Sequence, residues 1–409
     1  MPAGHRPARR ERRTARQARR LARTLGTLKG AFAKAGQFAA SRPDLLPAPA
    51  LEAFAGLRDR VPPLPLASLR GVLEEELGAP LEERFARFDP APLGAASVAQ
   101  AHRAALPDGA PVVVKVQYPW LEASLPADLA ILRRLLGLAA ARARRTPPDA
   151  GRLFAEFAAG LAEELDFQRE ARVAAEIAAN LAEDSRVVVP RVVASHSTRR
   201  VLTMHWLPAV PLADTAALAR LGVSPGEVLE ILARAYARQV FVDGLFHADP
   251  HPGNLFVVDE PEAARRPRVL FVDFGLSKRL DPTLRREMRL AIYALLRGDT
   301  GGFLAGMERM DMIAPGARPA AERAVAAMLE RLRGEGADPL RLGGDRVLGL
   351  KDEAKRLLQE TPGIQLPNDL LHYAKTLSYL FALGEQLDPD VDLMKLSVPY
   401  LLQFLAASD

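Results

Sequence analysis

The stretch HADPHPGN, at residues 247–254, gathers side-chain types that often do chemistry. His247 and His251 are four positions apart, a spacing that would make a zinc-binding pair on one face of a helix. Pro250 and Pro252 oppose a helix, because proline lacks an N–H donor and clashes with the preceding turn. The chain has no cysteine, which excludes thiolate ligands. The sequence therefore gives little support to a zinc site here.

The spacing of Asp249 and Asn254 indicates a different chemistry. Protein kinases carry the pattern H-R-D-x-x-x-x-N, in which the aspartate orients or accepts a proton and the asparagine binds magnesium. Asp273, in the later triplet DFG, would supply a second magnesium ligand. The runs NLFVV and RVLFVDFG predict the two short strands that follow such a loop. In this order, these features favour phosphoryl transfer.

The β-branched run at residues 111–119 predicts a buried strand that contains Lys115. A buried ammonium is costly unless it is paired, so Lys115 either contacts phosphates beside a helix glutamate or points outward from an edge strand. Glu164 and Glu170 are candidate partners, but they point about 240° apart on a helix. Two separate roles, or a helix break near Asp166, follow from that angle.

A loop rich in small residues precedes the lysine strand, where a kinase would carry a glycine-rich phosphate loop. It reads GAASVA at residues 94–99, and its candidate nucleotide contacts are Ala95, Ala96, Ser97 and Val98. Alanine cannot adopt the left-handed conformations of glycine cheaply. The loop is therefore expected to be stiffer and to hold phosphates differently, although alanine is common throughout this chain.

Apolar periodicity predicts the elements that position these residues. Helices are expected at residues 14–42, 48–60, 69–77 (with Ser68 as N-cap), 121–143 and 151–182. Strands are expected at 111–119, 187–193 and 199–207, and the chain is mostly helical from residue 225 onward. Few strands followed by many helices indicate an α+β fold.

Six ordered motifs resemble those of the UbiB-like (AarF-domain) atypical kinases, within the protein-kinase-like superfamily. They read KAGQ (followed by RPDLLP and DRVPPLP), GAASVAQAH, VVVKVQYP, ELD (followed by FQREA), HADPHPGN and DFG. The resemblance runs from about residue 22 to about residue 290. It implies a two-lobed, protein-kinase-like α+β fold with a basic tail (1–20), a helical extension (21–90), an N-lobe (91–205) and a helical C-lobe (206–409).

Carried over by position, the resemblance implies specific roles. Lys115 would contact the α- and β-phosphates of ATP or ADP and pair with Glu170. Asp249 would be the catalytic aspartate, while Asn254 and Asp273 would hold Mg²⁺. Further nucleotide contacts would come from Lys34, Gln37, Glu164, Asp166 and Met204. Many relatives have an acidic residue near His205, and this sequence departs from them at that position.

The sequence also bounds the partners. The arginine-rich residues 1–30 and the amphipathic residues 121–145 are candidate peripheral membrane contacts, and no apolar run is long enough to span a bilayer. The basic segment has no interleaved aromatic residues that could stack on bases, so binding to nucleic acid is not favoured. Nothing in the sequence specifies an oligomeric state. The chain is expected in the cytoplasm, with peripheral contact at the inner membrane face as an option.

The expected activity is ATPase or small-molecule kinase activity that supports quinone or lipid metabolism, with a lipid or quinone precursor as ligand. A nucleotide-gated scaffold and a true protein kinase are the alternatives. The protein kinase is disfavoured, because the chain after DFG runs through LSKRLDPTLRREM directly into a helix.

Overall fold

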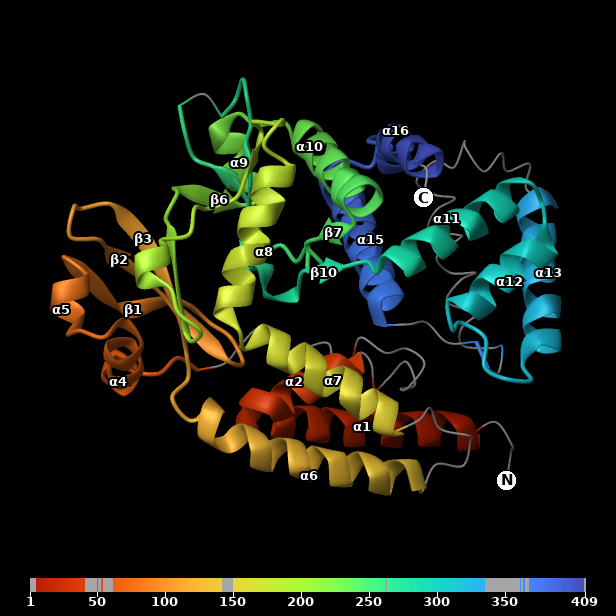
Figure 1. The fold of residues 1–409 in the computed structure, drawn as a ribbon, viewed down its shortest axis with the longest axis horizontal. Coiled ribbons are helices and arrows are strands. Elements are labelled where there is room, and N and C mark those ends of the chain that lie inside the picture. The colour runs from red at the N-terminus through yellow and green to blue at the C-terminus, as the bar shows by residue number, and fades with distance from the viewer. Residues whose placement is uncertain are drawn as a thin grey trace. The chain divides into compact units, whose positions relative to one another are not determined.

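The computed structural model describes residues 5–40, 62–141, 150–261, 263–334 and 368–407, together with residues 50, 53, 361, 363 and 364. The helix expected at 48–60 lies almost wholly outside these residues. The chain divides into two compact units. The first comprises Met1–Arg172 and Arg191–Trp206, and the second comprises Val173–Pro190 and Leu207–Asp409. Figure 1 shows the elements of both units.

The first unit contains a four-stranded antiparallel sheet. Its strands are β1 (Arg87–Ala95), β2 (Ala99–Ala105), β3 (Pro111–Gln117) and β5 (Val201–His205), in the order β1-β2-β3-β5. Val112, Val114 and Val116 of β3 are fully buried on one face. Lys115 lies between them on the other face, since successive side chains alternate. Because β3 is flanked by β2 and β5, Lys115 is not on an edge strand, and that interpretation was wrong.

The helices of the first unit surround a core shared with this sheet. They are α1 (His5–Leu28), α2 (Gly30–Ala40), α4 (Leu66–Leu77), α5 (Leu81–Arg84), α6 (Leu121–Ala141), α7 (Ala150–Glu164), the start of α8 (Phe167–Asn180) and the short η1 (Ala194–His196). Leu69 and Leu73 of α4, Phe157 and Leu161 of α7, and Phe167 of α8 join the strand valines in one hydrophobic cluster. These contacts fix α7 and α8 against the sheet.

Two predicted helices are interrupted in the structure. The expected helix 14–42 ends at Leu28 and restarts at Gly30, because Lys29 and Gly30 both have positive φ, at 56° and 50°. The expected helix 151–182 breaks between α7 and α8, as one of the two alternatives predicted. The break is stabilised by hydrogen bonds, since Gln117 Nε2 donates to the Leu165 carbonyl at 2.7 Å and Phe167 N–H donates to the Arg199 carbonyl at 3.1 Å.

The predicted N-cap at Ser68 was also wrong. Helix α4 begins at Leu66, three residues before the predicted start, with Pro65 as its N-cap in an extended conformation (φ −58°, ψ 143°). The Ser68 N–H donates to the Pro65 carbonyl at 2.9 Å, so Ser68 lies inside the first turn. A proline just before a helix start competes with a serine for the cap, because it presets the extended backbone that the cap needs.

The second unit has two small sheets and many helices. The strands β4 (Val187–Val188), β6 (Ala209–Pro211), β8 (Leu255–Val258) and β9 (Val269–Phe271) form a sheet in the order β4-β9-β8-β6, while β7 (Leu245–Phe246) pairs with β10 (Lys278–Arg279). β8 and β9 are antiparallel neighbours, which confirms the predicted pair of short strands. The strand expected at 187–193 is shorter than predicted, because Pro190 follows β4 and cannot donate to a ladder.

The helices of the second unit are α9 (Thr215–Leu221), α10 (Pro225–Ala237), α11 (Pro282–Leu296), α12 (Thr300–Arg309), α13 (Arg318–Gly334), α15 (Asn368–Leu387) and α16 (Leu393–Ala406), with the short helical turns η2 (Arg238–Asp243) and η3 (Phe274–Leu276). The main cluster of buried apolar residues in this unit includes Leu229 and Leu232 of α10, Phe271 of β9, and Leu380 and Leu383 of α15. It packs α15 against α10. Both units combine small sheets with a larger number of helices, which agrees with the α+β class.

Candidate functional site

Lys115 and Glu170 form an ion pair inside the first unit. The ammonium donates to both carboxylate oxygens of Glu170, each at 3.0 Å. Glu170 is 2% exposed, and the Lys115 side chain is 18% exposed. The Phe167 ring lies 5.0 Å from the same ammonium. Because a buried charge is costly without a partner, the pair explains how a lysine is tolerated in the middle of this sheet.

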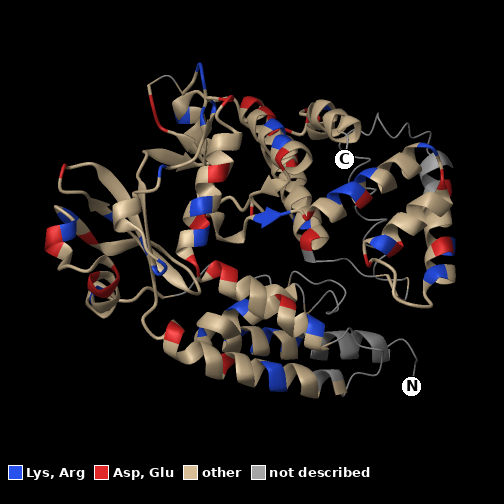
Figure 2. Ribbon diagram, in the orientation of Figure 1, with Lys and Arg blue, Asp and Glu red and all other residues tan. Residues whose placement is uncertain are grey.

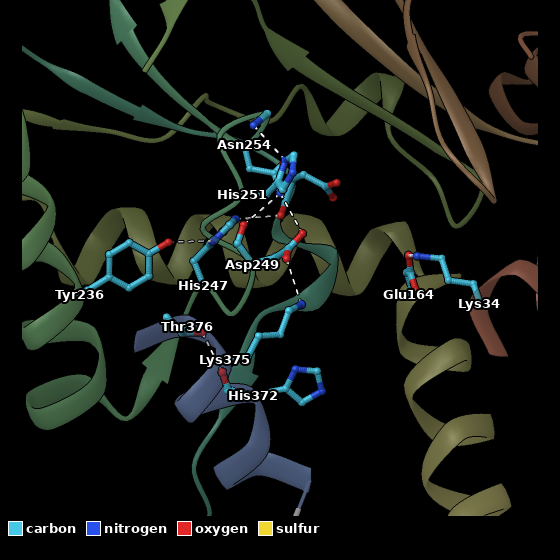
Figure 3. Close-up of polar contacts among 12 residues, drawn as sticks. Lys34, Glu164, Tyr236, His247, Asp249, His251, Asn254, His372, Lys375 and Thr376 are labelled. Carbon is cyan, nitrogen blue, oxygen red and sulfur yellow. Dashed lines mark hydrogen bonds and ion pairs between the residues drawn. The ribbon is translucent and has the colours of Figure 1, made fainter. Parts of the chain in front are cut away.

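A second ion pair of the first unit joins Lys34 of α2 to Glu164, the last residue of α7. Both side chains are largely buried, with 14% and 16% exposed, and Figure 3 shows the two side chains meeting end to end. Glu164 and Glu170 therefore serve different lysines from two separate helices. The large angle expected between the two glutamates is explained both by the helix break and by their different lysine partners.

Asp166 lies in the break between α7 and α8. Its carboxylate accepts a hydrogen bond from the Arg169 backbone N–H at 3.0 Å, which is the geometry of an N-cap for α8. Arg172 approaches the same carboxylate at 3.6 Å. These contacts give Asp166 a structural role. Gln37 lies three residues after Lys34 on α2. The nucleotide contacts predicted for Asp166 and Gln37 remain predictions.

The alanine-rich loop is tied down by backbone hydrogen bonds. Ala96 N–H donates to the Ala99 carbonyl at 2.8 Å, and the Tyr118 hydroxyl donates to the Ala96 carbonyl at 2.9 Å. Gly30 N–H donates to the Ser97 carbonyl at 3.1 Å, which links the start of α2 to the loop. These contacts agree with a stiff loop.

The residues of the first unit that are predicted to contact the nucleotide differ in their exposure to solvent. Ser97 and Val98 are each 3% exposed and Met204 is 7% exposed, whereas Ala95 is partly exposed and Ala96 is exposed. Met204 pairs with Val113 in the register of β5 and β3. Buried side chains can still offer backbone groups to a ligand, so main-chain contact is the form in which Ser97, Val98 and Met204 would contribute.

In the second unit, Asp249 is held from two sides (Figure 3). Asn254 Nδ2 donates to the Asp249 backbone carbonyl at 3.1 Å and to its Oδ2 at 3.2 Å. Lys375 Nζ donates to Oδ1 at 3.1 Å. The spacing in the sequence predicted roles for Asp249 and Asn254 but not this contact between them, and nothing in the sequence indicated Lys375. The carboxylate is thus fixed in direction while 21% of its side chain stays exposed.

His247 joins the Asp249 loop to the DFG segment. Its Nδ1 lies 3.2 Å from the Tyr236 hydroxyl, and its Nε2 lies 2.9 Å from the Asp273 carbonyl and 3.1 Å from the Val272 carbonyl. Burial lowers the pKa of His247, although nearby carboxylates oppose that shift. A neutral ring with Nε2–H donating and Nδ1 accepting satisfies these contacts. His247 therefore orients the loop and is not placed as a proton carrier.

Asp273 has a backbone conformation that favours glycine, with φ 62° and ψ 76°. It is one of three non-glycine residues at positive φ in the part of the chain that the structure describes. Strained backbone of this kind often marks a functional position. Asp273 is fixed by the hydrogen bond from His247 to its carbonyl, and Val272 N–H donates to the Asn254 carbonyl at 3.0 Å.

The donor atoms of Asn254 and Asp273 fit magnesium. Because the amide NH₂ of Asn254 points at Asp249, its amide oxygen faces away from that residue. Asp273 adds carboxylate oxygens, and magnesium prefers oxygen ligands, of which the protein commonly supplies only one or two. Among the described residues, no group of three His, Cys, Asp or Glu side chains is arranged to hold a metal. His251 instead accepts a hydrogen bond from Gly253 N–H at 3.2 Å.

Comparison with known proteins decides the family. The sequence profile of the ABC1 atypical kinase-like domain matches residues 56–305. The chain belongs to this family. It is 33% identical to an uncharacterized protein, sll0095, of Synechocystis over 96% of this chain and 68% of that protein. It is also 33% identical to a probable protein kinase UbiB of Marinobacter nauticus, over 93% of this chain and 69% of that protein.

A solved structure agrees with the family assignment. The chain resembles Rv3197 of Mycobacterium tuberculosis, solved in complex with erythromycin, with a TM-score of 0.58 and 26% identity. The match covers 94% of this chain and 95% of that one. Together with the family match, this likeness confirms the kinase-like α+β fold expected from the sequence.

The ABC1 match ends at residue 305, before two features that the sequence did not reveal. Lys375 lies on α15 and reaches Asp249, and Tyr379, one turn later, meets His251 edge to face at 6.5 Å. A lysine on an amphipathic helix is usually solvated, so no sequence signal could have singled out Lys375.

Among the described helices, none is both long and apolar enough to cross a membrane.

Proposed function

We propose that this ABC1-family protein binds a magnesium–nucleotide complex and transfers or releases the terminal phosphoryl group of ATP. The observation that carries the proposal is the pairing of Asp249 with Asn254, beside Asp273 in its left-handed conformation. This set provides a fixed carboxylate and oxygen ligands for a metal. The Lys115–Glu170 pair provides a fixed ammonium of the kind that contacts phosphates.

Each residue would have a separate task on one nucleotide. Lys115 would donate to the α- and β-phosphates, and Glu170 would keep its ammonium in place. Asn254 and Asp273 would hold magnesium, which when bound neutralises phosphate charge. Phosphoryl transfer needs mainly positioning and charge stabilisation from the protein, and these side chains supply both.

Asp249 would orient the acceptor oxygen. As the new bond forms between this oxygen and the γ-phosphorus, the bond from that phosphorus to the β–γ bridging oxygen breaks, and ADP leaves. The proton of the acceptor passes to Asp249 and then to solvent. With water as acceptor, the products are ADP and inorganic phosphate, while a lipid or quinone-precursor hydroxyl would give a phosphorylated product.

Phosphate release from MgATP tests the enzyme proposal. Asp273→Asn should lower the rate by about 100-fold or more, because the variant loses a charged metal ligand. Asp390→Asn, an exposed aspartate near the start of α16, is the matched control and should keep the wild-type rate. Equal release from wild type and Asp273→Asn would remove the proposal.

A nucleotide-gated scaffold is the second candidate. The Lys34–Glu164 pair favours it, because this contact holds α2 against α7 and would be altered by a ligand that competes for either charge. Tight MgATP or MgADP binding without phosphate release, in the presence of lipid and quinone-precursor mimics, would support the scaffold. Transfer of phosphate to a protein in trans would instead support a true protein kinase.

Peripheral membrane contact is proposed through α6. Ile131, Leu135 and Leu138 are exposed and lie at helical spacing, and Figure 2 shows basic residues in the second half of this helix and acidic residues in the first. An apolar stripe with Arg134 beside it on the helix suits an anionic lipid surface. Flotation with anionic liposomes that is lost in Leu135→Glu would support this placement, and equal flotation of both would oppose it.

A further inference from the structure

Lys375 is a charged residue beside the candidate site that belongs to none of the sequence motifs. It projects from α15 toward the Asp249 loop, as Figure 3 shows, and its Nζ lies 3.1 Å from Asp249 Oδ1. Asn254 holds the other carboxylate oxygen at 3.2 Å. The two donors approach Asp249 from different segments of the second unit, so together they fix both the position and the rotation of its carboxylate.

The ammonium of Lys375 is itself held in place. Tyr379, one turn further along α15, presents its ring 5.6 Å from Nζ, a distance at which a cation is attracted to the ring face. The same ring contacts His251 of the loop at 6.5 Å. α15 therefore contacts the loop twice, one turn apart, through Lys375 on Asp249 and through Tyr379 on His251.

The helix that carries Lys375 is anchored independently of this ion pair. Thr376, next in the chain, is fully buried, and Leu380 and Leu383 lie in the cluster that packs α15 against α10. A partly buried ion pair is weak evidence for stability, because desolvation offsets much of the attraction. The apolar face is sufficient to dock α15, so holding the helix does not by itself explain Lys375.

Lys278, Lys375 and Asp249 all act on the same buried ring, that of His372. Lys278 of β10 is 9% exposed and, together with Lys375, lies close enough to act on His372. The pKa of His372 falls to about 3, first through burial and then through these two lysines. Positive charge beside the aspartate suits a reaction in which negative charge develops on a phosphoryl group.

We propose that Lys375 is a positioning residue for the reaction: it holds the Asp249 carboxylate in the orientation that receives the acceptor oxygen. The proposal rests on the function proposed above and extends the site to a helix beyond the matched residues 56–305. It predicts that the charge and length of Lys375 affect turnover while nucleotide binding is left almost unchanged. A lysine that only docks the helix would instead affect stability.

The test uses the full chain and compares Lys375→Met, Lys375→Gln and Lys375→Arg with wild type. Phosphate release gives kcat and KM for MgATP, MgADP titration gives affinity, and thermal unfolding gives Tm. Lys375→Met should lower kcat by about 10- to 100-fold, because a misplaced catalytic group costs up to that factor. KM and MgADP affinity should stay within about twofold, and Lys375→Arg should recover most of kcat.

Two further variants keep the test decisive. Lys375→Gln retains a donor without charge, so it remains informative if Lys375→Met does not fold, and its kcat should lie between those of the methionine and arginine variants. Lys395→Met removes an exposed lysine of α16 and should behave as wild type in every assay.

Each outcome separates the two proposals. Wild-type kcat in Lys375→Met, while Asp273→Asn is inactive, would overturn the positioning role alone. Parallel losses of kcat, MgADP affinity and Tm would assign Lys375 to helix docking and would also overturn it. A wild-type protein that releases no more phosphate than Asp273→Asn would end the proposed function and this inference with it.

Discussion

The two units fix their charged groups in different ways. In the first unit, Lys34 and Lys115 each have a glutamate of their own, and both glutamates stand on either side of one helix break. In the second unit, one aspartate, Asp249, is shared by an amide and an ammonium from distant segments. The first arrangement pairs each cation with a largely buried carboxylate, and the second holds an anion by donors from two segments. Loss of a partner should therefore destabilise the first unit and misalign the second.

The largest effect is expected at the Lys115–Glu170 pair. Lys115→Met leaves Glu170 as a buried carboxylate without this partner, which should lower the free energy of unfolding by about 3 kcal/mol or more. Glu170→Gln should cost a comparable amount, while the double variant should cost less than the sum. Urea unfolding of the four proteins measures the coupling. Additive losses would show that the two groups are not energetically paired.

The second unit should instead respond to acid. Burial, followed by the charges of Lys278 and Lys375, lowers the pKa of His372 to about 3, whereas an unfolded histidine has a pKa of about 6.5. The unfolded state then binds more protons below pH 6.5, so this contribution to stability is present above pH 6.5 and lost as the pH falls toward 3. The loss is at most about 1.4 kcal/mol per pH unit.

His372→Leu isolates that contribution. The variant should lose less stability than wild type between pH 6.5 and 5, by about 1 to 2 kcal/mol. Urea midpoints at several pH values measure the difference, and the remaining pH dependence serves as the internal reference, because burial also lowers the pKa of His247. The same pH dependence in both proteins would show that His372 is not buried neutral.

The same contrast explains what could be predicted from sequence. The lysine strand, the catalytic-loop spacing of Asp249 and Asn254 and the strands β8 and β9 follow from spacing and hydrophobic runs within a few residues of one another. The helix break before α8 could be inferred only as an alternative, since the angle between two glutamates demands it. Short-range patterns of this kind survive because the fold keeps neighbours in the chain close in space.

The failures have physical causes too. Pro65, not Ser68, is the N-cap of α4. The helix expected at 14–42 is interrupted by the positive φ of Lys29, a conformation that a lysine rarely adopts. In the chain, Lys375 is separated from Asp249 by α11, α12 and α13. No local signal can bring such residues together, because the contact depends on how α15 packs on α10.

A smaller effect separates capping from ligand binding at Asp166. If its carboxylate only caps α8, Asp166→Ala should lower stability by about 1 kcal/mol, and Asp166→Asn should restore most of it because asparagine caps nearly as well. Nucleotide affinity should then be the same in both variants. If Asp166→Asn is as stable as wild type yet binds MgADP differently, its charge acts on the ligand, as the family resemblance implies.

The smallest effect on stability is expected in the alanine-rich loop. Ala96→Gly should lower the free energy of unfolding by about 0.5 to 1 kcal/mol, because glycine frees the unfolded chain. The hydrogen bonds from Ala96 N–H to Ala99 and from Tyr118 to the Ala96 carbonyl can still form. A freer loop should change the ratio of ATP affinity to ADP affinity by a few-fold. Lys34→Ala should change the same ratio, because it removes the cation of the Lys34–Glu164 ion pair. Titration of both nucleotides measures it, and unchanged affinities in both variants would count against a role of Lys34 and the loop in nucleotide binding.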